Sequence, residues 1–246
     1  MITLSIWGLN QLKNFLNKKL MRIKINFTKN TKPISIDNSC EILNSYIHRC
    51  FGENNSYHNS YSPYSISSMQ GGTLSNGNLS FENGMYIIVS IPDRNKHIFA
   101  DLLKGILSGI EIGYGMKFIN IEPLNLNVNK NFDWVQTICP IILREKKTNK
   151  YLVYTDDSFL EELTNRTIKK LKHYDENIDL TNFSISIVSK YNNNKVKKIK
   201  VKESINKCSM LRLKITGSPM TRKILYEHGL GSSTGSGFGA LKLLNV

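Results

Sequence analysis

The stretch Met21-Arg-Ile-Lys-Ile-Asn-Phe-Thr28 alternates strictly between apolar and polar residues. A period of two places successive side chains on opposite faces, as in a β-strand with one buried face. The apolar face carries Met21, Ile23, Ile25 and Phe27, and the polar face carries Arg22, Lys24 and Asn26. We therefore expect the fold to begin with this strand. Residues 1–20 lack the continuous apolar core of a signal peptide, and we expect either an added amphipathic helix or an upstream mis-start.

The segments after this strand predict the order β-α-β-β-α-β. Apolar residues at helical spacing indicate two helices, and the Asn-, Ser- and Gly-rich stretch that reaches about residue 80 contains short extended pieces. The predicted elements are a helix with a capping box of Asn38 and Glu41 that ends at Gly52, a strand at 85–91, a helix capped by Asp93 or Asn95, and a strand at 116–121. This order is that of a ferredoxin-like domain, in which two helices pack on one face of an antiparallel sheet.

A second unit of sheet and helix follows the polar stretch from Asn125 to Asn131. We expect strands at 134–144, 151–154, 183–188, 199–201 and 211–215, and a helix opened by a capping box of Ser158 and Glu161. The sequence therefore predicts an α+β fold of two tandem ferredoxin-like domains. Their expected limits are residues 21–127 and 131–246.

Several classes of protein are excluded by the absence of their patterns. No run of 18 apolar residues occurs, because Pro140 interrupts the longest apolar stretch, so we expect no membrane span. The four cysteines, Cys40, Cys50, Cys139 and Cys208, lie far apart without metal-ligand spacing. We therefore expect no disulfide framework, no metal and no cofactor, and a chain that works in a reducing cytoplasm.

The formal net charge is +14, from 33 Lys and Arg against 19 Asp and Glu, which suits a polyanionic partner. Lysine and asparagine are both abundant, at 26 and 28 residues, so part of the charge can reflect an AT-rich genome. Between residues 190 and 223, however, eleven basic residues face one acid, Glu203. Such a run is either a solvated outer face or a surface that holds an RNA backbone. The candidates for RNA contact are Lys198, Lys200, Lys202, Arg212, Lys214, Arg222 and Lys223.

The densest local signal is Gly229-Leu-Gly-Ser-Ser-Thr-Gly-Ser-Gly-Phe-Gly239, called the glycine run below. It reads Gly-apolar-Gly, five residues, Gly-apolar-Gly, with Leu230 and Phe238 as the apolar members. Glycines permit positive φ angles and leave backbone amides accessible to a phosphate. The alternative is a flexible hairpin loop before a final strand.

After two ferredoxin-like units, this pattern resembles the repeat-associated (RAMP) superfamily of CRISPR proteins, and most closely the Cas-six family of repeat-processing endoribonucleases. The resemblance implies metal-independent cleavage of precursor CRISPR RNA within its repeats, which leaves a 2′,3′-cyclic phosphate and a 5′-hydroxyl. It also implies RNA contacts from the glycine run, at Gly229, Gly231, Ser232, Ser233, Gly235, Gly237 and Gly239.

The same resemblance suggests catalytic residues in the first unit. His58, in the stretch Tyr57 to Gly72, falls where the family keeps its catalytic histidine, and Tyr46 fits a tyrosine that some members use. Core packing of Tyr46 is the alternative, since it lies on an apolar stripe. The family lysine is missing, because no Lys or Arg occurs between His58 and Gly72, so Lys24, Tyr61, Tyr64 or nearby serines would have to stabilise the scissile phosphate.

Two other functions remain open from the sequence. The same fold, charge and glycine run suit a non-cleaving RAMP subunit that contacts other subunits of a CRISPR effector complex. A binder of structured RNA outside CRISPR biology is a weaker possibility. The sequence does not decide whether the chain forms a homodimer.

Overall fold

The structure is a computed structural model that describes residues 22–52, 62–124, 133–146, 148–188, 194–201 and 203–244. The expectations for residues 1–20, His58, Tyr61 and Lys202, and the domain limits near residues 127 and 131, lie outside these ranges.

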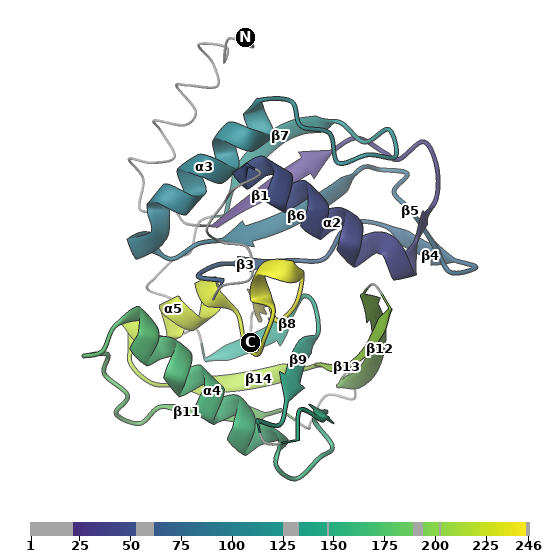
Figure 1. The fold of residues 1–246 in the computed structure, drawn as a ribbon. Helices are drawn as coiled ribbons and strands as arrows, with labels where there is room; N and C mark the ends of the chain where they lie inside the picture. The colour runs from purple at the N-terminus through teal and green to yellow at the C-terminus, as the bar shows by residue number, and fades with distance from the viewer. Residues whose placement is uncertain are drawn as a thin grey trace.

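The N-terminal unit, residues 22–124, is built on an antiparallel sheet in the order β3-β6-β1-β7. Its strands are β1 (Arg22–Phe27), β3 (Ser65–Ile66), β6 (Met85–Ser90) and β7 (Phe118–Pro123). The first strand therefore lies between the third and the fourth, which is the ferredoxin-like order. Helices α2 (Ile36–Phe51) and α3 (Lys96–Leu107) cover one face of this sheet (Figure 1), and a short helix η1 (Asp93–Asn95) precedes α3. A small sheet of β2 (Ile34–Ser35), β5 (Asn78–Ser80) and β4 (Thr73–Ser75) adjoins it.

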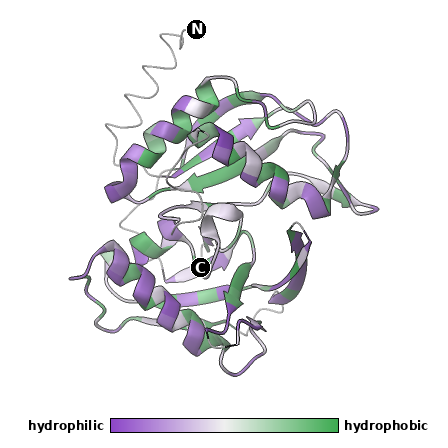
Figure 2. Ribbon diagram, viewed as in Figure 1, coloured by the Kyte–Doolittle hydropathy of each residue, from purple (hydrophilic) through white to green (hydrophobic). Residues whose placement is uncertain are grey.

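The predicted alternation along β1 fills the core of this unit. Ile23 and Ile25 are fully buried, and Ile25 pairs with Ile87 of β6 and Ile121 of β7. The two helices touch at Gly105, where a Cβ atom would lie 2.0 Å from the carbonyl oxygen of Cys50. A glycine is therefore required at this crossing. Figure 2 shows hydrophobic residues along β6 behind the helices.

One local expectation for this unit is wrong. α2 begins at Ile36 with Ser35 as its N-cap residue, so Asn38 and Glu41 lie inside the helix and form no capping box.

The C-terminal unit, residues 133–244, repeats the strand order in a sheet β11-β14-β8-β15. Its elements are β8 (Trp134–Thr137), α4 (Phe159–Tyr174), β11 (Ser184–Ile187), β14 (Arg212–Thr216), α5 (Pro219–His228) and β15 (Leu241–Leu243). The first strand, β8, again lies between the third and the fourth. The expected fold class, two tandem ferredoxin-like units, is therefore confirmed.

A second sheet extends this unit, in the order β10-β9-β13-β12. Its strands are β9 (Ile141–Arg144), β10 (Tyr151–Leu152), β12 (Lys195–Val201) and β13 (Ser204–Met210). The sequence indicated only residues 199–201 of the β12–β13 hairpin, because lysines occupy most of the positions that precede them.

The C-terminal segment lies between the two units, where Figure 1 shows α5 and the yellow glycine run. No helix within the described ranges is long and apolar enough to cross a membrane.

Candidate functional site

The glycine run brings its two Gly-apolar-Gly triplets against each other. The Leu230 amide donates to the Gly239 carbonyl at 2.9 Å, and a Cβ atom on Gly239 would lie 1.8 Å from the Leu230 carbonyl oxygen. Leu230 is fully buried and Phe238 is 2% exposed. Gly229 is also buried, and a Cβ atom on it would lie 2.7 Å from the Gly239 carbonyl oxygen, so Gly229 and Gly239 permit this close packing.

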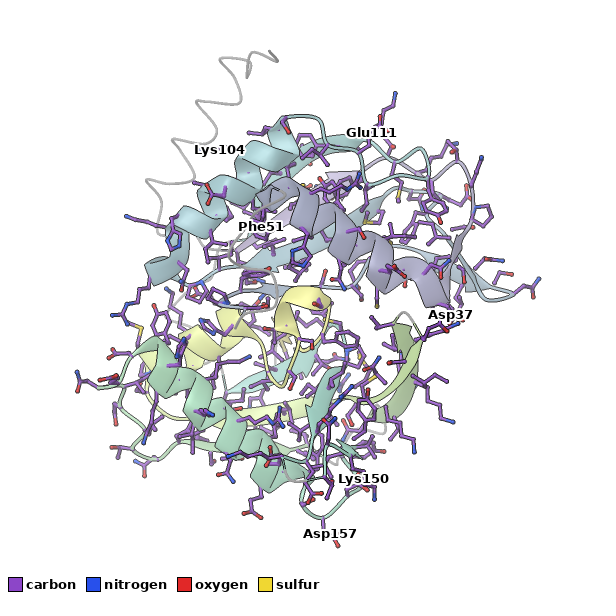
Figure 3. All side chains as sticks on the ribbon, in the orientation of Figure 1. Asp37, Phe51, Lys104, Glu111, Lys150 and Asp157 are labelled. Atoms are coloured by element: carbon purple, nitrogen blue, oxygen red, sulfur yellow. The ribbon has the colours of Figure 1, made fainter. Side chains whose placement is uncertain are left out.

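The middle of the run docks on the N-terminal unit. Thr234 Oγ1 donates to the carbonyl of Tyr64 at 3.0 Å, and a Cβ atom on Gly235 would lie 2.6–2.8 Å from atoms of Ser62 and Tyr64. Helix α2, whose ends are marked by Asp37 and Phe51 in Figure 3, contacts the short helix η2 (Thr234–Ser236) within the run. The glycine run therefore forms part of the interface between the two units, which is called the joint below.

Arg22 reinforces this joint from β1. The alternation of the sequence assigned it to a polar face, but the side chain is only 2% exposed. Its guanidinium donates to Ser90 Oγ at 2.9 Å and to the carbonyls of Tyr226 and Leu241, and it lies 4.1 Å from the centroid of the Tyr226 ring. Burial lowers the pKa of Arg22.

Two of the predicted RNA-binding cations form ion pairs, and one of these pairs crosses the joint. Lys223 Nζ lies 2.8 Å from Asp93 of the N-terminal unit and 3.3 Å from Glu227, while Arg222 pairs with Asp133. Glu227 is 2% exposed, and burial raises its pKa to about 7 despite the opposing effect of Lys223. Arg222 and Lys223 thus have acidic partners within the chain.

A pocket of about 960 Å³ opens between α2, α4 and the glycine run. The N-terminal unit contributes His48 of α2 and the residues Ser62 and Tyr64 before β3. The C-terminal unit contributes Lys146 and six residues of α4, together with residues 231–236 of the run. The lining residues of α4 are Glu162, Asn165, Arg166, Lys169, Lys170 and His173.

Of the predicted glycine-run residues, Gly231, Ser232, Ser233 and Gly235 line this pocket. Ser233 is exposed and adopts a left-handed conformation, with φ at 57°. Lys170 Nζ lies 3.3 Å from the carbonyl oxygens of both Gly229 and Gly231 and donates to them. Burial lowers the pKa of Lys170 to about 7, so this lysine holds the run in place with only part of its usual charge at neutral pH.

Tyr46 lies in the core of the N-terminal unit. It is fully buried, and its ring packs edge-on against Phe27 with centroids 5.6 Å apart. Burial raises the pKa of its hydroxyl well above the ordinary value. Tyr46 does not line the pocket, and its position favours the packing interpretation.

The other predicted cations lie on two surfaces away from the pocket. Lys198 and Lys200 are exposed on the outer face of β12. Arg212 and Lys214 are half-buried on the face of β14 that points away from α4 and α5. On that same face the Lys214 ammonium lies 5.7 Å from the ring centroid of Trp134.

Comparisons with known proteins place the chain in a family. A family described as CRISPR associated protein Cas6, C-terminal, matches residues 123–243. A CRISPR-associated endoribonuclease-like protein Cas6 from Pyrococcus furiosus is 30% identical over 174 residues, which cover 64% of this chain and 68% of that protein. The chain belongs to the Cas6 family.

Solved Cas6 structures share its fold. A CRISPR associated protein Cas6 superposes with a TM-score of 0.75 at 20% identity, covering 92% of this chain and 99% of the other. A Cas6-related protein from Pyrococcus furiosus gives a TM-score of 0.76 at 21% identity, with the same coverage of both chains. A further match, described as a RAMP protein binding different RNA substrates, has a TM-score of 0.75 at 20% identity and covers 92% and 100%.

Sequence reasoning missed the α4 side of the pocket in this Cas6 chain. Glu162, Arg166, Lys169 and His173 follow the spacing of a single helix face. That spacing was available from the sequence, but nothing local shows that this face meets the glycine run. Trp134 was likewise assigned to a strand without a role.

Proposed function

We propose that the chain is an endoribonuclease that binds CRISPR repeat RNA and cleaves precursor transcripts within the repeats. The proposal rests on the pocket, in which one histidine from each unit and the cations of the C-terminal unit meet the glycine run in a member of the Cas6 family. The name of the Pyrococcus furiosus relative supports the same reaction class.

The proposed reaction needs no nucleophile from the protein. A general base removes the proton from the ribose 2′-hydroxyl, and the 2′-oxygen attacks the adjacent phosphorus. The bond from phosphorus to the 5′-oxygen breaks, and a general acid gives that oxygen a proton. The products are a 2′,3′-cyclic phosphate and a 5′-hydroxyl. Imidazole titrates near neutral pH and suits both proton transfers, each worth about 10²–10⁴-fold in rate.

We propose His58 for one of these transfers. It precedes Ser62, which lines the pocket, by four positions, so the chain holds the two Cα atoms within about 14 Å of each other. His48 and His173 also line the pocket and supply imidazoles from its described walls. One of these can act as the second acid or base.

The open face of the C-terminal sheet is proposed to hold the RNA strand. The register places Lys214 beside Trp134, and it places Arg212 beside Gln136, which in turn pairs with Lys242. Cations beside an accessible aromatic ring bind single-stranded RNA through phosphate contacts and base stacking, and Trp134 is half-buried on this face. Lys198 and Lys200 extend the positive charge onto the β12–β13 hairpin.

Parallel alanine variants test the assignment of the histidines. In EDTA, His58→Ala should slow cleavage of a labelled repeat RNA by about 10²-fold or more while RNA affinity persists. His48→Ala and His173→Ala show which imidazole supplies the second transfer. His97→Ala is the matched control, because His97 is exposed on α3 and does not line the pocket. Full cleavage by the variants at His58, His48 and His173 would refute these assignments.

The second candidate is a non-cleaving RAMP subunit of a CRISPR effector complex. Two observations favour it: the absence of Lys and Arg between His58 and Gly72, and the buried hydroxyl of Tyr46. Tight repeat binding by the wild-type chain with no cleavage under any of these conditions would select this function.

A further inference from the structure

The stretch from His58 to Gly72 lacks a cation that can stabilise the scissile phosphate. As negative charge develops on the phosphate oxygens, a positioned cation lowers the barrier. Lys24, the cation that the sequence suggested in the N-terminal unit, interacts with other residues of that unit. Its ammonium lies 3.3 Å from Glu122 and 4.9 Å from the centroid of the Tyr86 ring, and it does not line the pocket.

Helix α4 presents cations to the pocket from the other unit. Two of them are engaged with the protein. Arg166 pairs with Glu162 at 2.8 Å, donates to Ser232 Oγ at 2.8 Å and donates to the carbonyl of Arg144. These bonds fix α4 against the glycine run and partly neutralise the guanidinium. Lys170 is bound to the carbonyls of the run, as described above.

Lys169 differs from both neighbours. It lines the pocket and is exposed, and no acid of the described residues lies within ion-pair distance of its ammonium. It follows Arg166 by three positions on the same helix face. The hydrogen bond from Arg166 to Ser232 therefore also positions the turn of α4 that carries Lys169. Lys146 is exposed at the same pocket but lies in the turn after β9 rather than on a helix.

We propose that Lys169 binds the scissile phosphate, so that α4 of the C-terminal unit supplies the cation that the His58 stretch lacks. The inference rests on the proposed function. The site is then composite: His48, Ser62 and Tyr64 line the pocket from the N-terminal unit, and the phosphate ligand comes from the C-terminal unit.

The test compares substitutions at two exposed lysines of one helix. Lys172 is exposed on α4 but does not line the pocket, so Lys172→Ala is the matched control for Lys169→Ala. Single-turnover cleavage of a repeat RNA should slow about 100-fold in Lys169→Ala and remain at the wild-type rate in Lys172→Ala. Lys169→Arg should restore the rate to within about tenfold, because the charge is kept.

A second arm uses a repeat RNA with deoxyribose at the cleavage position, which binds but cannot react. Lys169→Ala should reduce the slope of log affinity against log salt by about 0.7 relative to Lys172→Ala, as expected for one lost phosphate contact.

The two arms separate two kinds of failure. If the wild type cleaves and Lys169→Ala cleaves as fast as Lys172→Ala, the inference is wrong and the proposed function stands. If the wild type does not cleave, the proposed function fails. The salt slopes are then measured with the unmodified repeat RNA, and equal slopes for the two variants would also reject Lys169 as a phosphate ligand.

Discussion

At the scale of single residues, the packing of the glycine run depends on the absence of a Cβ atom in glycine. Gly239 combines a φ of +65° with a backbone approach that leaves no room for a Cβ atom. Gly109, after α3, has a φ of +84°, but no neighbouring atom lies within 4 Å of the place that a methyl group would take. Alanine variants at Gly109 and Gly239 therefore separate the cost of conformational strain from the cost of steric overlap.

Gly109→Ala should lower the free energy of unfolding by about 1–2 kcal/mol, since an L-residue is strained at positive φ. Gly239→Ala should cost at least about 2 kcal/mol more, because the methyl group would also force the Leu230 carbonyl away. Urea unfolding of the two variants measures the difference. Equal losses would mean that the triplets are not packed as closely as the structure shows.

Arg22 and Tyr46 show what single positions do not reveal. The alternation of β1 correctly separates Ile23 and Ile25 from the polar positions, yet Arg22 is buried because α5 and β15 cover the start of the strand. Tyr46 was correctly placed on an apolar stripe, and its depth in the core needed the structure. The local pattern shows on which face of a strand or helix a side chain lies. Contacts with residues far away in the chain decide how exposed that side chain is.

At the scale of elements, the open face of the C-terminal sheet combines stacking and charge. Trp134→Ala should weaken binding of single-stranded repeat RNA about 5- to 150-fold, because stacking on one base contributes about 1–3 kcal/mol. The slope of log affinity against log salt should stay unchanged, since no phosphate contact is lost. Lys214→Ala should instead reduce that slope by about 0.7. Fluorescence titrations over a range of salt concentrations measure both quantities.

The aromatic control is Tyr114→Ala, because Tyr114 is exposed on a loop of the N-terminal unit. If Trp134→Ala binds as tightly as Tyr114→Ala, bases do not stack on this sheet.

Elements with clear periodicity were predictable, but α5 and most of the β12–β13 hairpin were not, and the single strand expected at 134–144 is two strands, β8 and β9, in different sheets. α5 was missed although Ser218 caps it and Pro219 occupies its first turn, which are recognised start signals. Charged residues interrupt its short apolar stretch, and one of them, Lys223, pairs with Asp93 across the joint. Its amphipathic pattern is therefore weak. The β12–β13 hairpin was missed in part because its exposed lysines carry no core signal.

At the scale of the whole molecule, the joint between the units contains a titrating carboxyl. The pKa of Glu227 is about 7, above its ordinary 4.5, because burial disfavours the carboxylate. The folded state therefore gains stability from protonated Glu227 below about pH 4.5, and this contribution is lost as the pH rises through 7.

Glu227→Gln removes this dependence. The difference in free energy of unfolding between wild type and variant should grow by roughly 3 kcal/mol from pH 8 to pH 4.5, in favour of the wild type. Chemical denaturation at both pH values measures it, and Glu176→Gln, at an exposed carboxyl, serves as the control. A difference that is independent of pH would show that the pKa of Glu227 is not raised in the folded protein.

The candidate site itself belongs to this largest scale. The glycine run and the family resemblance were visible in the sequence, but the pocket exists only because α2, α4 and the run converge from three parts of the chain. No local periodicity specifies that convergence. The cations that line the pocket could therefore be identified only from the structure.

The central claim is that this Cas6 chain cleaves repeat RNA by attack of the 2′-hydroxyl. The most direct measurement is mass spectrometry of a repeat RNA, taken from the CRISPR arrays of the source organism, after incubation with the wild-type chain in EDTA. We predict two fragments, one ending in a 2′,3′-cyclic phosphate and one beginning with a 5′-hydroxyl. Intact RNA, or fragments with a 3′-hydroxyl and a 5′-phosphate, would contradict it.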